Sequence, residues 1–259
     1  MKILTDIIYK DEDEKHKFDV YIPDIPNSKA IVLIHGGAFV TGDKSSDSDI
    51  ATEITKNGYF CFVPNYRLAP KNIYPSQLDD MNSFMKYLIK SDFEFDKNKI
   101  GILGYSVGGN LAIELSLKYG YTICSRSGVI EFEEWLKEHK NTKEKEFTSL
   151  AGNSPDVSDD FDGSDDETYK WVLNTYLGND NENIRKSSLL NRIDKNCGNM
   201  FLINSNREFI PKDGVIKLQN KLIELNKDVS VKFFKGPKHA KAYWKKAIVP
   251  TLNFFDNNL

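Results

Sequence analysis

The sequence is poor in the residues that build disulfide frameworks and metal sites, since its 259 residues include three cysteines and four histidines. Cys61, Cys124 and Cys197 are odd in number, lie far apart and form no CxxC pair, so no disulfide framework is predicted. We expect reduced, mostly buried thiols in a cytoplasmic protein. The segment 1–20 has no long apolar core or cleavage site, and no apolar run reaches membrane-spanning length. Neither a signal peptide nor a membrane helix is therefore predicted.

The sequence also lacks an excess of either charge, because 35 basic and 38 acidic residues are mixed along it and leave a net charge of −3. We therefore predict no nucleic-acid surface and no electrostatic membrane anchor. Hydrophobic residues make up 40% and charged residues 28%, as in ordinary soluble globular proteins. The length suits one large domain with a sizeable core, which we expect to span residues 1–259.

Apolar runs that alternate with amphipathic stretches indicate the fold class. The run at 30–35 is continuous, which is typical of a strand buried on both faces. Further strands are expected at 59–64, also buried, and at 99–105. This alternation predicts an α/β protein with a mostly parallel central sheet and helices on both faces. Further strands are expected at 3–9, 17–22, 121–125, 199–205 and 229–234, and helices at 49–58, 75–89, 107–119, 165–177, 212–226 and 240–256.

The segment 131–190 interrupts this alternation, and we interpret it as a small cap-like insertion over one end of the sheet. Its acidic loop, 154–167, raises the possibility of a calcium site. Placing Gly163 at the sixth position of an EF-hand loop puts Ser158 at the first and Tyr169 at the twelfth, and neither suits its ligand position. No calcium site is predicted, and the loop is expected to be solvated and to cap the helix that follows.

The first motif with chemical meaning is "GYSVGG" at 104–109. It places Ser106 between a buried strand and an apolar helix, where a tight turn projects a serine hydroxyl above the sheet. The flanking Gly104 and Gly108 permit strained backbone and close packing. The pentapeptide alone is a weak signal that also fits a plain strand-to-helix turn, but its context is the one that a nucleophilic serine requires.

Two further motifs fit the same chemistry. "HGGAFVTGD" at 35–43 follows a buried strand, and its glycines let backbone N–H groups face a bound oxyanion. The side chain of His35 is expected to orient this loop. His239 lies between the last strand and the last helix, where a general base reaches the sheet edge. His16 and His139 lie in charged stretches and are expected to be exposed to solvent.

These motifs together resemble the α/β-hydrolase fold, and within it the esterases and lipases related to hormone-sensitive lipase. The "HGG-x-F-x-x-G" pattern at 35–42 is similar to that group, as are "NYRLAP" at 65–70, "YP" at 74–75 and Asp79. "GYSVGG" at 104–109 resembles its nucleophile turn, and the motifs follow the fold's order of serine, acid and histidine.

The resemblance is dense over about 30–120 and 186–245 and thin between them. The chain lacks the long N-terminal helical cap of larger members, because strands are expected almost from residue 3. It is therefore most similar to the compact bacterial acetyl-esterase and feruloyl-esterase-like branch.

The resemblance implies a Ser–His–acid mechanism that needs no metal or organic cofactor. Ser106 is the implied nucleophile and His239 the implied base. The implied oxyanion hole consists of the backbone N–H groups of Gly37, Ala38 and Val107.

The acid of this fold follows the strand that precedes the penultimate helix. Glu208 lies there, three residues after the expected strand ends at Ser205, although an aspartate is usual at this point. Asp213 is the alternative, but it is expected in the first turn of the next helix, where it favourably complements the helix dipole. Glu208 is predicted as the acid, and the longer side chain compensates for a loop that is one residue shorter than expected.

Phe39, Tyr105, Tyr243 and Trp244 adjoin motif residues and are predicted to line a pocket for short, acetyl-type acyl groups, with core packing as the alternative reading for Tyr243 and Trp244. The predicted partner is a small-molecule ester, including esters of sugars. A formamidase or small-amide hydrolase on the same residues and a non-catalytic ligand-binding protein stay open as alternatives, whereas the chain has no room for the additional domain of a peptidase. The sequence indicates neither the natural ester nor the oligomeric state.

Overall fold

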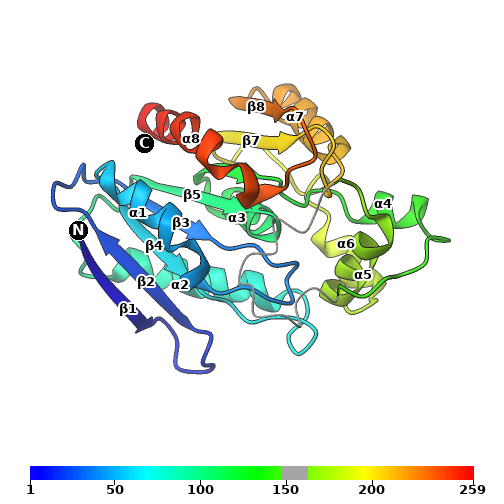
Figure 1. Ribbon diagram of the computed structural model, residues 1–259, viewed down its shortest axis with the longest axis horizontal. Helices are drawn as coiled ribbons and strands as arrows, with labels where there is room; N and C mark the ends of the chain where they lie inside the picture. The colour runs from blue at the N-terminus through cyan, green and yellow to red at the C-terminus, as the bar shows by residue number, and fades with distance from the viewer. Residues whose placement is uncertain (148–162) are drawn as a thin grey trace.

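A mostly parallel eight-stranded sheet forms the centre of the molecule (Figure 1). The computed structural model describes residues 1–147 and 163–259. The strands lie in the order β1-β2-β4-β3-β5-β6-β7-β8, in which β1, β2 and β4 pair antiparallel and β3 to β8 run parallel. Their bounds are β1 Lys2–Ile8, β2 Lys17–Ile22, β3 Ala30–Ile34, β4 Phe60–Pro64, β5 Ile100–Tyr105, β6 Thr122–Arg126, β7 Met200–Ser205 and β8 Val229–Phe234.

Helices cover both faces of this sheet, as predicted, because each face of its apolar strands needs a hydrophobic layer against it. Helices α2, α3 and α7 contribute to the larger core cluster, whereas α1 and α8 contribute to a second cluster on the other face. The bounds are α1 Ser48–Lys56, α2 Ser76–Lys90, α3 Val107–Tyr119, α4 Glu133–Glu138, α5 Asp166–Leu177, α6 Asn181–Ser187, α7 Asp213–Glu224 and α8 Trp244–Asn258, with the short 3₁₀ helices η1 Lys44–Asp47 and η4 Ala240–Tyr243.

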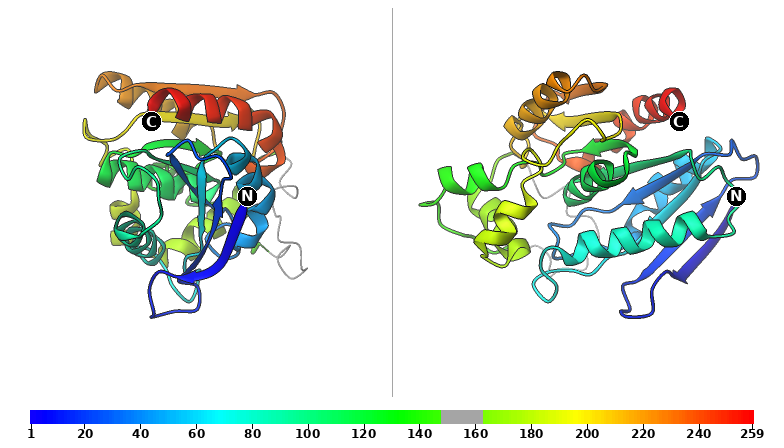
Figure 2. Two further views of the ribbon diagram at one scale, coloured as in Figure 1. Left: turned by 90° about the vertical axis from the view of Figure 1, so that its left-hand side faces the viewer. Right: turned by 180° about the vertical axis from the view of Figure 1, so that it is seen from behind.

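The segment 131–190 contributes α4, α5 and α6, which group beyond one end of the sheet and away from both termini (Figures 1 and 2). Part of the acidic loop, 154–162, lies outside the described residues. The side chain of Asp165 accepts a hydrogen bond from the Thr168 N–H at 3.0 Å, so the end of the loop caps α5 as expected. Among the described helices, none is long and apolar enough to cross a membrane.

The expectation that His16 is exposed is wrong. The hairpin between β1 and β2 turns back over α2, so His16 is completely buried, and its Nε2 lies 2.9 Å from Oδ1 of Asp80. The buried Asp80 also accepts hydrogen bonds from the Arg67 guanidinium at 2.7–3.1 Å. The family resemblance singled out Asp79, which is exposed. The carboxylate that contacts Arg67 of the "NYRLAP" segment is instead that of Asp80. His139 is partly exposed and stacks on Trp135.

We predict that Asp80→Asn destabilises the fold by about 1–3 kcal/mol, because it weakens the hydrogen bonds that the buried carboxylate makes with His16 and with the half-buried Arg67 guanidinium. The neighbouring Asp79→Asn serves as a matched control, since its carboxylate is exposed and its loss should cost less than about 0.5 kcal/mol. Urea unfolding of both variants measures the difference. Equal stability of the two variants would show that the Asp80 cluster does not stabilise the fold.

Candidate active site

The turn between β5 and α3 holds Ser106 in a conformation that few residues adopt, with φ 53° and ψ −126°. Its N–H donates to the Arg126 carbonyl of β6 at 2.8 Å, which fixes the turn against the sheet. A Cβ on Gly104 would lie 2.0 Å from the Gly108 carbonyl oxygen, and one on Gly108 would lie 2.3 Å from that of Ile34. Both glycines are therefore required by backbone packing, and the strained turn presents the serine hydroxyl above the sheet.

The side chains of Ser106, His239 and Glu208 form a hydrogen-bonded series in which the histidine lies between the serine and the glutamate. Nε2 of His239 lies 3.0 Å from Oγ of Ser106, and Nδ1 lies 2.6 Å from Oε2 of Glu208. Oε1 of Glu208 accepts the Ser205 N–H at 2.7 Å, and the carboxylate is buried. Because a carboxylate only accepts, it holds the histidine proton on Nδ1 and leaves the Nε2 lone pair for the serine hydroxyl. The alternative acid Asp213 is exposed at the start of α7.

The loop that carries His239 is held from behind by residues that the sequence did not single out for this role. The Ala240 N–H donates to Oγ of the buried Ser127 at 2.9 Å, and that hydroxyl contacts the Tyr243 hydroxyl at 2.7 Å. Tyr243 in turn donates to the Ile203 carbonyl at 2.9 Å. Among the described residues Tyr243 does not line the cavity, and its hydroxyl instead helps to fix the histidine loop, which agrees with the alternative of core packing.

The loop after β3 brings backbone N–H groups to the serine. Gly37, Ala38 and Phe39 all have positive φ, at 114°, 54° and 61°. This backbone turns Gly37 and Ala38 toward the cavity that Ser106 and Val107 also line. Val107 opens α3, so its N–H is among those without an intrahelical acceptor. The arrangement suits an oxygen that develops negative charge next to Ser106.

The cavity above Ser106 is small and mostly apolar, with a volume of about 40 Å³. Tyr105 borders it. Phe39 and Trp244 are not among the described residues that line it. Phe39 stacks on Tyr176 with ring centroids 3.5 Å apart, and Trp244, the first residue of α8, packs against the second core cluster. The apolar wall instead comes largely from segments whose sequence carries no motif, and consists of Val129, Phe147, Tyr169, Val172, Phe209 and Ile210.

His35 is buried behind the same loop. Its ring stacks on Tyr66 with centroids 4.2 Å apart, and its Nδ1 lies 2.7 Å from the Gly36 carbonyl oxygen. Burial lowers the pKa of His35 to about 4, so the ring is neutral at neutral pH. This position suits the orienting role expected for it. In residues 1–147 and 163–259, no group of three or more His, Cys, Asp or Glu side chains is arranged to hold a metal ion.

Comparison with known proteins gives a family match and a fold match. The BD-FAE family model matches residues 18–222. The kynurenine formamidase of Meyerozyma guilliermondii is 31% identical over 105 residues, which are 40% of this chain and 39% of that protein. Neutral cholesterol ester hydrolase 1 of Rattus norvegicus is 30% identical over 106 residues, which are 38% of this chain and 26% of that protein. The chain thus spans less than half the length of these curated relatives.

Two solved structures share the fold along nearly the whole chain. A truncated carbohydrate esterase from gut microbiota aligns with a TM-score of 0.78 at 18% identity, covering 100% of this chain and 96% of that one. An esterase of the bacterial hormone-sensitive lipase family aligns with a TM-score of 0.71 at 19% identity, covering 93% and 80%. The molecule therefore has the α/β-hydrolase fold.

We predict that stability falls in mild acid because of His35. The unfolded chain binds a proton at His35 near the ordinary pKa of about 6.5, and the folded chain binds it only near pH 4. Between these values the unfolded state holds more protons, so the free energy of unfolding decreases as pH falls, by about 3 kcal/mol in total. Urea unfolding across this range should show a shallower pH dependence for His35→Gln than for wild type. The same pH dependence of the free energy of unfolding in both proteins would show that His35 is not its cause. His139→Gln, at a partly exposed histidine, is the control and should leave that pH dependence as in wild type.

Proposed function

We propose that this chain, which belongs to the BD-FAE family, is a serine esterase that hydrolyses carboxylic esters. The observation that carries the proposal is the hydrogen-bonded series Ser106–His239–Glu208 beside the backbone N–H groups of two loops. This combination supplies a nucleophile, a base with a fixed tautomer and an oxyanion site in one cavity. The solved esterases that share the fold support the same class of reaction.

In the proposed reaction, Oγ of Ser106 attacks the ester carbonyl while Nε2 of His239 takes its proton. Glu208 stabilises the resulting imidazolium through Nδ1. The N–H groups of Gly37, Ala38 and Val107 bind the oxyanion, for which a single donor contributes roughly 3–4 kcal/mol in comparable enzymes. His239 gives the proton to the alcohol oxygen as the ester bond breaks and the alcohol leaves. It then takes a proton from the water that attacks the acyl-enzyme carbonyl, and it passes this proton to Oγ of Ser106 as the carboxylic acid is released.

The proposed substrates are esters of short acyl groups, such as acetyl, with small alcohols or sugars. The narrow cavity and its wall of bulky side chains, among them Phe147, Tyr169 and Phe209, support a small acyl group. Formamide hydrolysis is the second candidate, since a formyl group is smaller still and the formamidase relative shares the aligned segment. A ligand-binding protein without activity is disfavoured because serine, histidine and acid are all hydrogen-bonded.

We expect p-nitrophenyl acetate and butyrate to be hydrolysed with a higher kcat/KM than esters of eight or more carbons. Ser106→Ala should lower kcat on the best of these esters by about a millionfold, because the hydrogen-bonded residues act as a unit. Retention of more than a few per cent of activity would contradict the nucleophile, and preference for long chains would contradict the acyl class. Faster turnover of formyl anilides than of any ester would favour the formamidase.

We expect Glu208→Gln to lower kcat by about 10³–10⁴-fold, because an amide in place of the carboxylate no longer fixes the tautomer or stabilises the imidazolium. Asp213→Asn is the matched control, and it should leave kcat within about twofold and cost at most about 1 kcal/mol of stability. Steady-state kinetics and urea unfolding of the two variants separate these effects. Loss of kcat in Asp213→Asn alone would transfer the acid role to Asp213.

A further inference from the structure

We propose that Asp43 and Asn65 are positioning residues that hold the oxyanion loop, residues 35–42, in its active geometry. This inference rests on the proposed function. Both side chains lie at the exit of the loop, where Asp43 also borders the cavity that Ser106 lines.

The oxyanion loop combines a strained backbone with two internal hydrogen bonds, which the N–H groups of Val40 and Thr41 donate to the Gly37 carbonyl at 3.0 and 2.9 Å. Three consecutive residues, Gly37, Ala38 and Phe39, have positive φ, and the left-handed region costs about 1 kcal/mol or more for each of the two with a Cβ. Such backbone persists only where contacts outside the segment fix it. Phe39 is held by its stack on Tyr176 and by its carbonyl, which accepts the Ala69 N–H at 2.9 Å.

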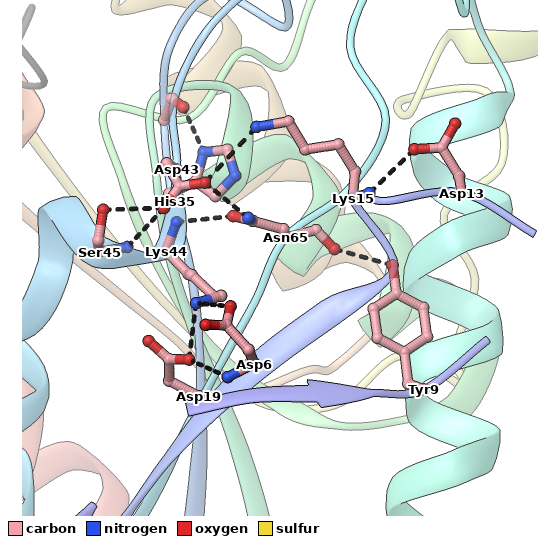
Figure 3. Close-up of polar contacts among 11 residues, drawn as sticks. Asp6, Tyr9, Asp13, Lys15, Asp19, His35, Asp43, Lys44, Ser45 and Asn65 are labelled. Atoms are coloured by element: carbon pink, nitrogen blue, oxygen red, sulfur yellow. Dashed lines mark hydrogen bonds and ion pairs between the residues drawn. The ribbon is translucent and has the colours of Figure 1, made fainter. Parts of the chain in front are cut away.

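The exit of the loop is held by Asp43 and Asn65 (Figure 3). Oδ1 of Asp43 accepts the N–H of Ser45 at 3.0 Å and its hydroxyl at 2.8 Å. Oδ2 accepts the Nδ2–H of Asn65 at 2.7 Å. Oδ1 of Asn65 then accepts the Lys44 N–H at 2.6 Å. The two side chains thus close a ring of hydrogen bonds around the first residues after the loop.

Asn65 connects this ring to the rigid part of the fold. It follows the last residue of β4, is 5% exposed, and its N–H donates to the Lys17 carbonyl at 2.9 Å. Its carbonyl accepts the Tyr9 hydroxyl at 2.8 Å. The backbone of Asn65 is therefore fixed by the sheet and the β1–β2 hairpin, and its side chain bonds to Asp43, so the exit of the loop is anchored to β4 and to the hairpin.

The charge of Asp43 supports this arrangement. Burial raises the pKa of its carboxyl, but hydrogen bonds from Ser45 and Asn65 and the nearby Lys15 ammonium together lower that pKa below its ordinary value. The carboxylate is therefore ionised at neutral pH and acts only as an acceptor. Charge-assisted hydrogen bonds of this kind are stronger than neutral ones, as a strained loop requires.

The exit of the loop is packed directly against its entry. A Cβ on Gly42 would lie 2.5 Å from the Gly36 carbonyl oxygen and 2.5 Å from Nδ1 of His35. A shift of Asp43 and Gly42 therefore displaces the peptide that precedes Gly37, whose N–H is one of the proposed oxyanion donors. Misplacement of such a group by about 1 Å can reduce a rate by about 10²-fold.

The complementarity of the pair provides its test. In Asp43→Asn, two amide groups face each other as donors, and in Asn65→Asp, two carboxylates face each other as acceptors. Each single change should lower kcat and kcat/KM together by about 10- to 100-fold with KM nearly unchanged, because the oxyanion is bound only in the transition state. The double variant exchanges donor and acceptor, so the hydrogen bonds between the two side chains and those to Ser45 and Lys44 can form again, whereas the 3.5 Å contact of the Lys15 ammonium with Oδ2 of Asp43 cannot. It should recover kcat to within about fivefold of wild type.

Asp194→Asn is the matched control. Asp194 also accepts a backbone N–H and an amide from one asparagine, Asn196, but it is exposed and lies in the loop before the amino end of β7. Its kcat should be unchanged. Rates are expressed per folded molecule, measured by circular dichroism and size exclusion, and phosphonylation of Ser106 by a fluorophosphonate should slow in parallel with kcat.

Unchanged kcat in both single variants, or a double variant as slow as the slower single, would overturn the positioning role. A fall in melting temperature with kcat per folded molecule unaltered would do the same, because it shows a purely structural role. Failure of the proposed function looks different: wild type itself then hydrolyses neither ester nor formamide and does not react with the fluorophosphonate.

Discussion

The site depends on one backbone constraint, the positive φ of Ser106 where β5 turns into α3. A Cβ at either flanking glycine would overlap with backbone atoms, so the turn can form only if β3, β5 and α3 approach at backbone contact distance. That approach places the serine hydroxyl at the carboxyl edge of the sheet and directs the first N–H groups of α3 at the same space. The fold and the nucleophile are thus consequences of a single packing arrangement.

The parallel sheet explains why the other groups meet there. The carboxyl ends of β3, β7 and β8 lead into the loops that carry Gly37, Glu208 and His239, and parallel strands place those ends on one edge. Two of these loops have positive φ at non-glycine residues, including Ala38 and Ala240. The buried strands and their two helical layers form a rigid frame, and the loops are held to it by buried hydrogen bonds such as that of Ser127.

Hydrophobic periodicity allowed the strands and the helices on both faces to be predicted, whereas Ser106, His239 and Glu208 were indicated by motifs that resemble those of known hydrolases. The structure brings these three side chains within hydrogen-bond distance. The sequence did not allow the cavity wall to be predicted, since Tyr169 and Val172 belong to an inserted helix with no motif of its own. It also misplaced His16, because a charged stretch hides a hairpin that buries this ring against Asp80. Contacts between residues distant in the chain, such as Asp43 with Asn65, leave no local pattern.

The central claim is that the fold makes one serine a nucleophile, and covalent labelling followed by peptide mass mapping tests it most directly. The folded protein treated with a fluorophosphonate should gain one adduct, located on Ser106, and the same protein unfolded in urea should gain none, because the hydrogen bond from Ser106 to His239 exists only in the folded state. An adduct on a different serine, or equal labelling of folded and unfolded protein, would contradict the account.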